Sequence, residues 1–378
     1  MQKPRREPNP QAKNFRPPFC PNPNCRFHLS SDDWRVVKDG TYCRPGDQAR
    51  IQRFSCLHCR RSFSTQTFSA TYWLRRRSLL VRIAELSVTC AALRQTARTL
   101  HVSHTTVGRH LARAGRHCIL YHRNPLRDLA LPEPLVVDGF ETFEYSQYFP
   151  CHFNLAVGSQ SWFHYHFTDS PLRRKGRMTD FQRKRRADLE ATFGRPDPKA
   201  VEKGMAELLR PLVATVPKDA DLLLYSDDHR AYPRALRRLP PDGPVIDHQI
   251  TSSKARRTRR NPLFPVNLAD LLLRHSNANH KRETIAFSKR RQAAIERLAI
   301  FTVWRNCIKW RQENGPRETA AMVLGLLGRA KTWRRLFQRR LFPAKSDLPG
   351  IWKDYYWRKV KTTALGTQQT MHCCRYAF

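Results

Sequence analysis

Two short apolar runs, each ending in an aspartate, organise the hydrophobic pattern of this chain. One leads from Leu135 to Asp138 and the other from Leu222 to Asp227. Both are rich in β-branched or aliphatic residues and are bounded by prolines or polar residues, which is typical of buried strands. A carboxylate at the tip of a buried strand is unfavourable unless it is compensated, and hard divalent cations prefer carboxylate oxygens. Each aspartate taken alone is equally typical of an ordinary turn at a strand end.

The pattern around these runs alternates with a period of two and then of 3.6 residues. The first run extends through Phe143 and Tyr145, and two more alternating runs follow at 152–157 and 162–167, which predicts an antiparallel meander. The next elements predicted are a helix at 199–213, the strand that ends at Asp227, a short helix at 232–239, a strand at 245–250 and a helix beginning near Asn267. Two stretches dominated by arginine and lysine interrupt this order. Residues 173–186 are predicted to form a surface loop facing nucleic acid, and residues 254–260 lead into the last helix.

A sharper helical pattern precedes the meander, between residues 89 and 116. Apolar residues recur at helical spacing on both sides of a break at 101–103, with Ser103 as the N-cap of the second helix. This pattern predicts a helix-turn-helix. The residues expected to face a DNA major groove are Thr105, Thr106, Arg109, His110 and Arg113. A plain helical hairpin with a solvated basic face has the same pattern.

Two close cysteine pairs lie before the helices. Cys20 and Cys25 form one pair, and Cys56 and Cys59 form the other. Pairs at this separation can bring four thiolates to one Zn²⁺ ion, so we predict a zinc ribbon at 18–70. Further residues that can stand in as ligands are Cys43, His28 and His58.

Composition narrows the class of partner. The chain has 378 residues, of which 40% are hydrophobic, enough for two or three domains with their own cores. Lys and Arg number 69 against 31 acidic residues, and the formal charge of +38 favours nucleic acid over an anionic membrane surface. No run approaches the roughly 18 apolar residues of a membrane span, and the first residues lack the apolar segment of a signal peptide. An intracellular, cytoplasmic protein is therefore expected, and its 11 cysteines favour metal ligation over disulfides.

Strand order and short motifs together resemble a known superfamily. Residues 226–232, with Asp227 five residues before Tyr232, look like the block after the fourth strand of ribonuclease H-like catalytic domains. Residues 282–289 look like a block of bacterial insertion-sequence transposases that carry an amino-terminal zinc ribbon. From about 18 to 310, the chain resembles insertion-sequence transposases of the acidic-triad type. The fold class implied is multidomain α+β: zinc ribbon, helix-turn-helix, an RNase H-like α/β domain with a mixed five-stranded sheet and flanking helices, and a helical carboxyl-terminal region.

The resemblance implies a catalytic site that binds two Mg²⁺ ions. Asp138 and Asp227 match the two aspartates of the family, whereas the adjacent Asp228 is expected to point to the opposite face. Such a site activates a water or a DNA 3′-hydroxyl and stabilises the leaving oxygen at phosphorus. Both carboxylates are therefore predicted to be Mg²⁺ ligands.

The third catalytic residue departs from the family pattern. A glutamate is expected at the start of the last helix, but this sequence has Asn267 there, with Arg274 as the basic DNA-contacting residue seven positions on. An asparagine carbonyl ligates Mg²⁺ without adding charge. Asn267 is equally explained as a helix N-cap with Asp270 in a capping-box-like position. Glu283, with Arg290 seven residues on, is the chief rival ligand, and Asp270 ranks after it.

The predicted domains follow from these modules. They are a disordered basic tail at 1–17, the zinc ribbon at 18–70, the helix-turn-helix at 72–124, the catalytic domain at 132–312 and a helical basic region at 313–378. The stretch 295–310 is apolar on most sides and is predicted to be a core helix. Residues 333–340 mix aromatic and basic side chains, which suits nucleic acid or a solvated amphipathic helix equally.

The function expected is Mg²⁺-dependent cleavage and joining of DNA strands at the terminal repeats of an insertion sequence. By resemblance, the partners are double-stranded DNA and further copies of the chain, with no membrane, and the protein associates with the nucleoid. The rival functions are a catalytically inactive DNA-binding regulator built on the same modules and a basic RNA-associated structural protein. The RNA-associated structural protein does not account for the two strand-end aspartates.

Overall fold

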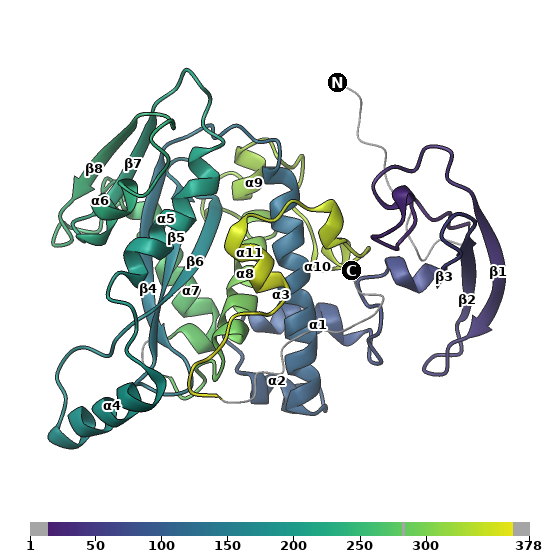
Figure 1. The fold of residues 1–378 in the computed structure, drawn as a ribbon, viewed down its shortest axis with the longest axis horizontal. Coiled ribbons are helices and arrows are strands. Elements are labelled where there is room, and N and C mark those ends of the chain that lie inside the picture. Colours follow the sequence, from purple (N-terminus) through teal and green to yellow (C-terminus); the bar gives the residue numbers. More distant parts are fainter. Residues whose placement is uncertain (1–13, 282–283, 366–378) are drawn as a thin grey trace.

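A computed structural model describes residues 14–281 and 284–365 (Figure 1). A small antiparallel sheet comes first, with the strand order β1-β2-β3. Its strands are β1 (Val36–Cys43), β2 (Arg50–Cys56) and β3 (Ser62–Ser64). We call residues 14–70 the β1–β3 module. Its core is a cluster of aromatic rings that includes Phe342 from far along the chain, whose ring lies 5.2 Å from that of Phe19. The module therefore packs against the carboxyl-terminal part of the chain through Phe342.

Three helices follow the module. They are α1 (Leu79–Ser87), α2 (Leu93–Thr99) and α3 (His104–Leu126). Ser103 caps α3 as predicted, because its hydroxyl accepts the Thr106 N–H at 3.2 Å. Helix α3 is longer than predicted and is buried over most of its length, since it packs against α8 (Arg291–Cys307) through the centre of the molecule. Gly115 makes this contact possible: a Cβ there would lie 2.6 Å from the backbone oxygen of Glu296.

The larger sheet has five strands in the order β6-β5-β4-β7-β8, which confirms the predicted mixed five-stranded sheet. Its strands are β4 (Leu135–Phe143), β5 (Pro150–Gly158), β6 (His164–Pro171), β7 (Leu222–Asp227) and β8 (Ile246–Thr251). Strands β4, β5 and β6 form the predicted antiparallel meander, and β7 and β8 run parallel to β4. Tyr145 lies outside β4, in a turn with a φ of 56°. Strands β4 and β7, the first and fourth of this sheet in chain order, are therefore neighbours.

Helices cover both faces of the larger sheet (Figure 1). One core contains α3, α7 (Phe264–Ser276) and α8 together with Val136 and Phe140 of β4. The other contains α5 (Ala200–Val213) and α6 (Ala231–Leu236) together with Leu135 and Val137. This alternation follows from the two-residue period of a strand. The first core also takes in α1 and α3, so it continues across the predicted boundary between residues 124 and 132.

Helix α4 (Asp180–Phe193) corrects the prediction of a surface loop at 173–186. Only the first part of that stretch is irregular. Thr179 and Gln182 form a capping box, and the arginines, lysines and glutamate that follow favour helix. No residue of α4 is buried, and Figure 1 shows the helix standing away from the body at the lower left.

The predicted helical region at 313–378 contains only short helices among the residues that the structure describes. They are α9 (Ala320–Val323), α10 (Trp333–Leu336) and α11 (Gly350–Tyr356). Gly325, Gly328 and Pro343 interrupt any continuous helix in this region. Trp352 of α11 is fully buried against Phe167 of β6, so the segment completes the core. In the described ranges, no helix has both the length and the apolar character needed to span a membrane.

Candidate metal centres and nucleic-acid surface

The four predicted cysteines meet in one cluster. Cys20 and Cys25 precede β1, and Cys56 and Cys59 lie at the tight turn between β2 and β3. The four sulfur atoms lie within 4.8 Å of one another, and three of the side chains are buried. Among the described residues, this is the one group of three or more cysteine, histidine or carboxylate side chains whose ligand atoms are close enough to bind a single metal ion. A buried set of four thiols suits a tetrahedral Zn²⁺ ion.

Groups around the cluster shift the pKa values of its thiols in ways that favour a bound cation. Burial raises the pKa of the Cys20 thiol, so a thiolate there needs a positive charge beside it. For Cys56, burial is outweighed by hydrogen bonds from the Cys59 backbone and the Trp34 indole, whose Nε1 lies 3.2 Å from Sγ, and the pKa falls to about 7. Donors that favour the thiolate orient a ligand before metal binds. The residues present therefore fit Zn²⁺.

The three substitute ligands lie around or away from the cluster. His58 Nδ1 is 3.5 Å from Cys25 Sγ, at the edge of the group. His28 Nδ1 is 2.8 Å from the carbonyl oxygen of Cys20. Cys43 is exposed at the far end of β1. The structure therefore brings together the four cysteines that the spacing singled out.

Asp138 and Asp227 lie at matching levels of neighbouring parallel strands. Val136 of β4 pairs with Tyr225 of β7, and two residues further along each strand the same register reaches the two aspartates. Asp138 shares its face of the sheet with Val136 and Phe140, and Asp227 shares the same face with Tyr225. Adjacent strands are about 4.8 Å apart. The two aspartates therefore lie on the face that α7 covers, near enough for the charge of Asp227 to raise the pKa of Asp138.

The electrostatics of Asp138 reflect this placement. Burial is the main cause that raises its pKa, to about 6, and the charges of Asp227 and Asp270 add to the effect. Two hydrogen bonds oppose the rise: Oδ1 accepts the Gly139 N–H at 2.7 Å and the Tyr232 hydroxyl at 3.1 Å. A carboxylate that is repelled by like charges gains when a cation joins the group. Hard oxygen donors held this way fit Mg²⁺.

Asp227 and Asp228 differ in their surroundings. Asp227 is the last residue of β7, and its Oδ1 accepts the His229 N–H at 2.9 Å. Asp228 is exposed, and its Oδ2 accepts the Ser253 N–H at 3.4 Å. The Ser253 side chain, and then this backbone N–H, lower the pKa of Asp228. This bond draws Asp228 toward the chain that follows β8.

Helix α7 begins earlier than predicted, which removes one interpretation of Asn267. The helix starts at Phe264 with a proline in its first turn, and the Asn267 N–H bonds to the Leu263 oxygen at 3.0 Å. The N-cap interpretation is wrong because Asn267 lies inside the helix. Proline fixes the backbone angle of a first turn and needs no donor there, which explains the earlier start.

One turn further along α7, Asp270 and Arg274 form an ion pair at 3.2 Å. The Arg274 guanidinium also lies 5.6 Å from the centre of the Phe140 ring, so it is held inward, against the sheet. Asp270 contributes to the raised pKa of Asp138, which places its charge near the pair of aspartates. Glu283 and Arg282 lie outside the described residues.

Two residues near the aspartates carried no role in the sequence analysis. His152 of β5 is half-buried, and its shielded Nε2 lies against Gly139, where a Cβ would come within 2.2 Å of it. Desolvation, together with the charges of His229 and Lys175, lowers the pKa of His152 to about 4. A glycine inside a strand signals such a close approach. Tyr232 was part of the sequence block 226–232, but its hydrogen bond to Asp138 could not be predicted, because the two residues are far apart in the sequence.

The residues predicted to face a DNA major groove divide into exposed and buried ones. Thr105 and Arg109 are exposed, and Thr106 is half-buried with its hydroxyl 3.1 Å from that of Ser103. Arg113 and His110 correct the prediction of an outward face. Both are buried: Arg113 donates to the Tyr72 oxygen, and His110 lies 2.9 Å from the Arg76 oxygen. The segment between the β1–β3 module and α1 covers them, which a helical pattern alone does not show.

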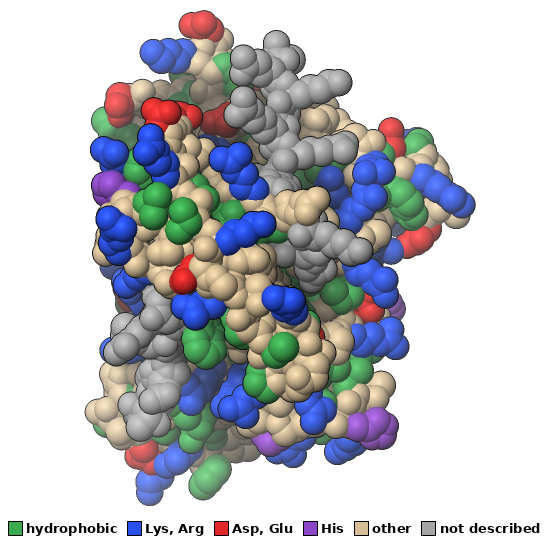
Figure 2. Space-filling model, turned by 90° about the vertical axis from the view of Figure 1, so that its right-hand side faces the viewer, with side chains coloured by type: hydrophobic (Ala, Val, Ile, Leu, Met, Phe, Trp, Pro, Cys, Tyr) green, Lys and Arg blue, Asp and Glu red, His purple; other side chains and the backbone are tan. Residues whose placement is uncertain are grey.

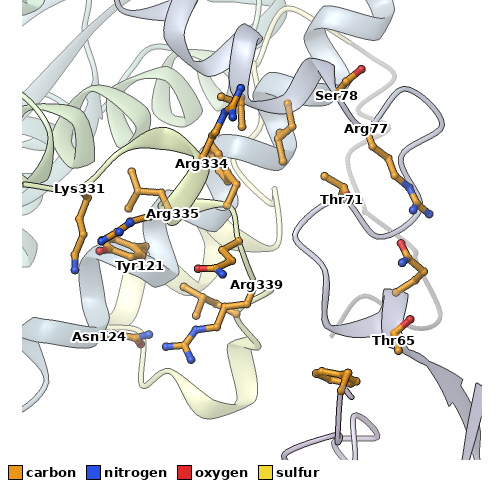
Figure 3. Close-up of a pocket in the computed structure, with 18 of the residues that line it drawn as sticks. Thr65, Thr71, Arg77, Ser78, Tyr121, Asn124, Lys331, Arg334, Arg335 and Arg339 are labelled. Carbon is orange, nitrogen blue, oxygen red and sulfur yellow. The ribbon is translucent and has the colours of Figure 1, made fainter. Parts of the chain in front are cut away.

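A large cleft separates the β1–β3 module from the helical body. Its volume is about 2250 Å³, and 11 of the residues that line it are lysine or arginine against two acidic residues. Both acids, Asp47 and Glu85, are paired with arginines of the same lining. Figure 3 shows Arg77, Thr65 and Thr71 on one wall and residues of the 331–339 segment on the other.

The surface around the cleft is basic as well. Figure 2 views the molecule from the side of the β1–β3 module, and lysine and arginine side chains outnumber acidic ones across the visible face. The exposed run 254–260, which connects β8 to α7, forms a second basic stretch beside Asp228. Positive surfaces of this kind attract polyanions.

Comparisons with known proteins give little further information. No protein-family model matches the sequence, and no curated protein matches it. Among solved structures, the chain is similar to one in the cryoEM structure of a simian T-cell lymphotropic virus intasome in complex with the PP2A regulatory subunit B56 gamma. The identity is 15%, the TM-score is 0.22, and the match covers 63% of this chain and 70% of that one. A likeness at this level carries no argument about function.

Proposed function

We propose that this chain is a DNA transposase with an RNase H-like catalytic domain. The observation that carries the proposal is the placement of Asp138 and Asp227 on the same face of two neighbouring parallel strands, within a sheet of order β6-β5-β4-β7-β8. An antiparallel meander whose first strand pairs with a later parallel strand is the arrangement that the resemblance implies. The rise in the Asp138 pKa supports a site that gains from a bound cation.

The site residues have separate tasks. Asp138 and Asp227 would hold Mg²⁺, and Asn267 or Asp270 of α7 would add a further oxygen. When bound, two such ions activate a water or a 3′-hydroxyl and stabilise the leaving oxygen of an in-line displacement at phosphorus. The Tyr232 hydroxyl and the Gly139 amide orient the Asp138 carboxylate. The basic run 254–260 neutralises the phosphodiester near this edge of the sheet.

DNA recognition belongs to the other end of the molecule in this proposal. The zinc-bearing β1–β3 module, the exposed start of α3 at Thr105 and Arg109, and the basic cleft together offer a surface for the backbone of a DNA duplex. Contacts to phosphate fix the register, and the few contacts to base edges select the terminal repeat. Transposases of this type work as oligomers on paired ends, and we propose the same here.

Substitution of the aspartates tests the proposal. Purified full-length protein is incubated with Mg²⁺ and labelled DNA from both flanks of its own coding sequence, and both cleavage and binding are measured. We expect Asp138→Asn and Asp227→Asn to abolish cleavage and leave DNA binding intact. Asp228→Asn is the matched control, since Asp228 is exposed and bonded to Ser253, and it should cleave normally. Cleavage by either of the first two variants would refute the catalytic assignment.

One observation favours a second function. Asn267 stands where the resemblance implies an acid, which is the change expected in a protein that binds the ends without cutting them. In that case the wild type and the aspartate variants all bind the same DNA and none cleaves it. The same experiment therefore separates the inactive regulator from the transposase.

A further inference from the structure

A small pocket on the β1–β3 module combines aromatic rings with arginines. Its volume is about 380 Å³, in the range of pockets that take small ligands. The residues that define its character are Tyr42, Arg53, Arg61, Tyr72, Trp73 and Arg77. No acidic residue lines it among those that the structure describes, although Arg53 pairs with Asp39 beside it. The pocket therefore suits a flat group that carries negative charge.

Trp73 is the most unusual of these residues. Its side chain is 63% exposed, and its backbone φ is 64°, a region that bulky side chains rarely adopt. Both features are unfavourable for folding, and strained residues of this kind gather at binding sites. The Tyr72 ring lies 5.8 Å from the Trp73 ring, and the Arg340 guanidinium lies 5.1 Å from the Tyr72 ring. Packing behind Tyr72 thus holds the aromatic pair in place while the Trp73 ring stays open to a ligand.

The pocket adjoins the large basic cleft. Arg44, Gln66 and Arg77 line both of them. Figure 3 shows Arg77 on the same wall of the cleft as Thr65 and Thr71. A strand whose phosphates lie in the cleft can therefore turn one base into the pocket without leaving the protein surface.

We infer that this pocket binds an unpaired nucleobase of a DNA strand whose backbone lies in the cleft. Trp73 stacks on the base, and Arg61 and Arg77 hold its phosphate. This inference rests on the proposed DNA-binding function and adds a preference to it: the protein prefers ends with unpaired bases over fully paired ones. Stacking tolerates any base, because every base has a flat π-face.

Binding of two duplexes tests the inference with the full-length protein. One duplex is blunt, and the other has the same paired sequence with a short single-stranded overhang that carries 2-aminopurine. We expect tighter binding of the overhang duplex and quenching of 2-aminopurine fluorescence on stacking. Trp73→Ala should weaken overhang binding by about 5- to 100-fold and remove the quenching, and leave blunt-duplex affinity unchanged. Trp73→Phe keeps a ring and should retain part of the preference.

Trp357, directly after α11, provides a matched control. Trp357 is 36% exposed and its ring lies 5.1 Å from Tyr356, so Trp357→Ala removes a similar exposed aromatic outside the pocket and should change nothing. Zinc content and circular dichroism verify that each variant folds.

The outcomes separate the inference from the function on which it rests. If the wild type binds neither duplex, the DNA-binding function itself is refuted. If it binds both equally and Trp73→Ala has no effect, the pocket assignment alone fails. Displacement of the overhang by an equal concentration of deoxyadenosine monophosphate would show that the occupant is a free nucleotide, which also overturns the assignment.

Discussion

The hydroxyl of Tyr232 donates a hydrogen bond to Oδ1 of Asp138 across 3.1 Å. The two residues are far apart in the chain, and Tyr232 reaches Asp138 because α6 follows directly after β7, the parallel neighbour of β4. The Tyr232 side chain is nearly fully buried, so the contact is shielded from water. A single hydroxyl therefore helps to keep the carboxylate of Asp138 ionised.

Removal of this hydroxyl gives the first prediction. Tyr232→Phe keeps the ring and removes the donor, so the pKa of Asp138 should rise further, by about one unit. Mg²⁺ binding needs the ionised carboxylate, and the acid limb of the cleavage rate should shift to higher pH by the same amount. The pH profile of cleavage measures this shift. An unchanged profile would mean that Asp138 does not titrate in the active range.

The contribution of α7 gives the second prediction. Asn267 is half-buried, and Asp270, on the same helix face, is engaged by Arg274. We expect Asn267→Ala to raise the Mg²⁺ concentration needed for cleavage by about 10-fold or more and Asn267→Asp to lower it. Titration of cleavage against Mg²⁺ measures both. If Asp270→Asn abolishes cleavage while Asn267→Ala has no effect, Asp270 is the third ligand.

The third prediction concerns the four-cysteine cluster. The purified protein should contain one zinc per chain, and Cys56→Ser should lose it and make residues 14–70 sensitive to proteases, because this metal holds together a module with a small core. Metal analysis and limited proteolysis measure these effects. Cys43→Ser serves as control, since Cys43 is exposed and away from the cluster, and it should retain full zinc content.

Two glycines of α3 give the fourth prediction, as a matched pair. A methyl group at Gly115 would collide with the backbone of Glu296, whereas one at Gly108 would only contact Leu93 Cδ1 at 3.9 Å. Gly115→Ala should therefore lower the free energy of unfolding by about 1–3 kcal/mol. Gly108→Ala should raise it by up to about 1 kcal/mol, because alanine favours helix. Urea denaturation measures both, and equal effects would contradict the close packing of α3 on α8.

Acid should destabilise the protein, which is the fifth prediction. Burial lowers the pKa of three histidines to about 4 and of three others to about 3; these are His117, His122 and His152, and His164, His166 and His280. An unfolded histidine titrates near 6.5, so between about pH 6.5 and 4 the unfolded chain binds protons that the folded chain does not. The free energy of unfolding should be highest above pH 6.5 and fall as the pH decreases through this window.

The size of this acid effect is measurable. Each buried histidine contributes at most about 2 kcal/mol between pH 7 and pH 5. The raised pKa of Asp138 acts in the opposite direction, because its carboxyl takes up a proton more readily in the folded chain. Urea midpoints at the two pH values give the net result, and a higher midpoint at pH 5 would contradict the burial of these side chains.

Local pattern was sufficient for several features of this protein. The spacing of Cys20, Cys25, Cys56 and Cys59 predicted one cluster, and the structure confirms that they meet. Alternation of apolar and polar residues predicted the meander, and the resemblance implied the mixed five-stranded sheet; the structure contains both. The periods of strands and helices and the geometry of metal ligation act over a few residues, so they can be read from the sequence.

Tertiary contacts decided the rest. Arg113 and His110 lie on what looks like a polar helix face, yet carbonyl groups of the segment before α1 cover and bind them. The proline in the first turn of α7 favours the early start of this helix and can be recognised in the sequence. The placement of Asp270 near Asp138, in contrast, depends on how the helix packs on β4. The basic cleft is lined by the β1–β3 module and by the carboxyl-terminal segment 329–341, next to Phe342, which packs into the core of that module. Burial of a side chain depends on partners that are remote in sequence, so periodicity identifies a face of a helix or strand but not what covers it.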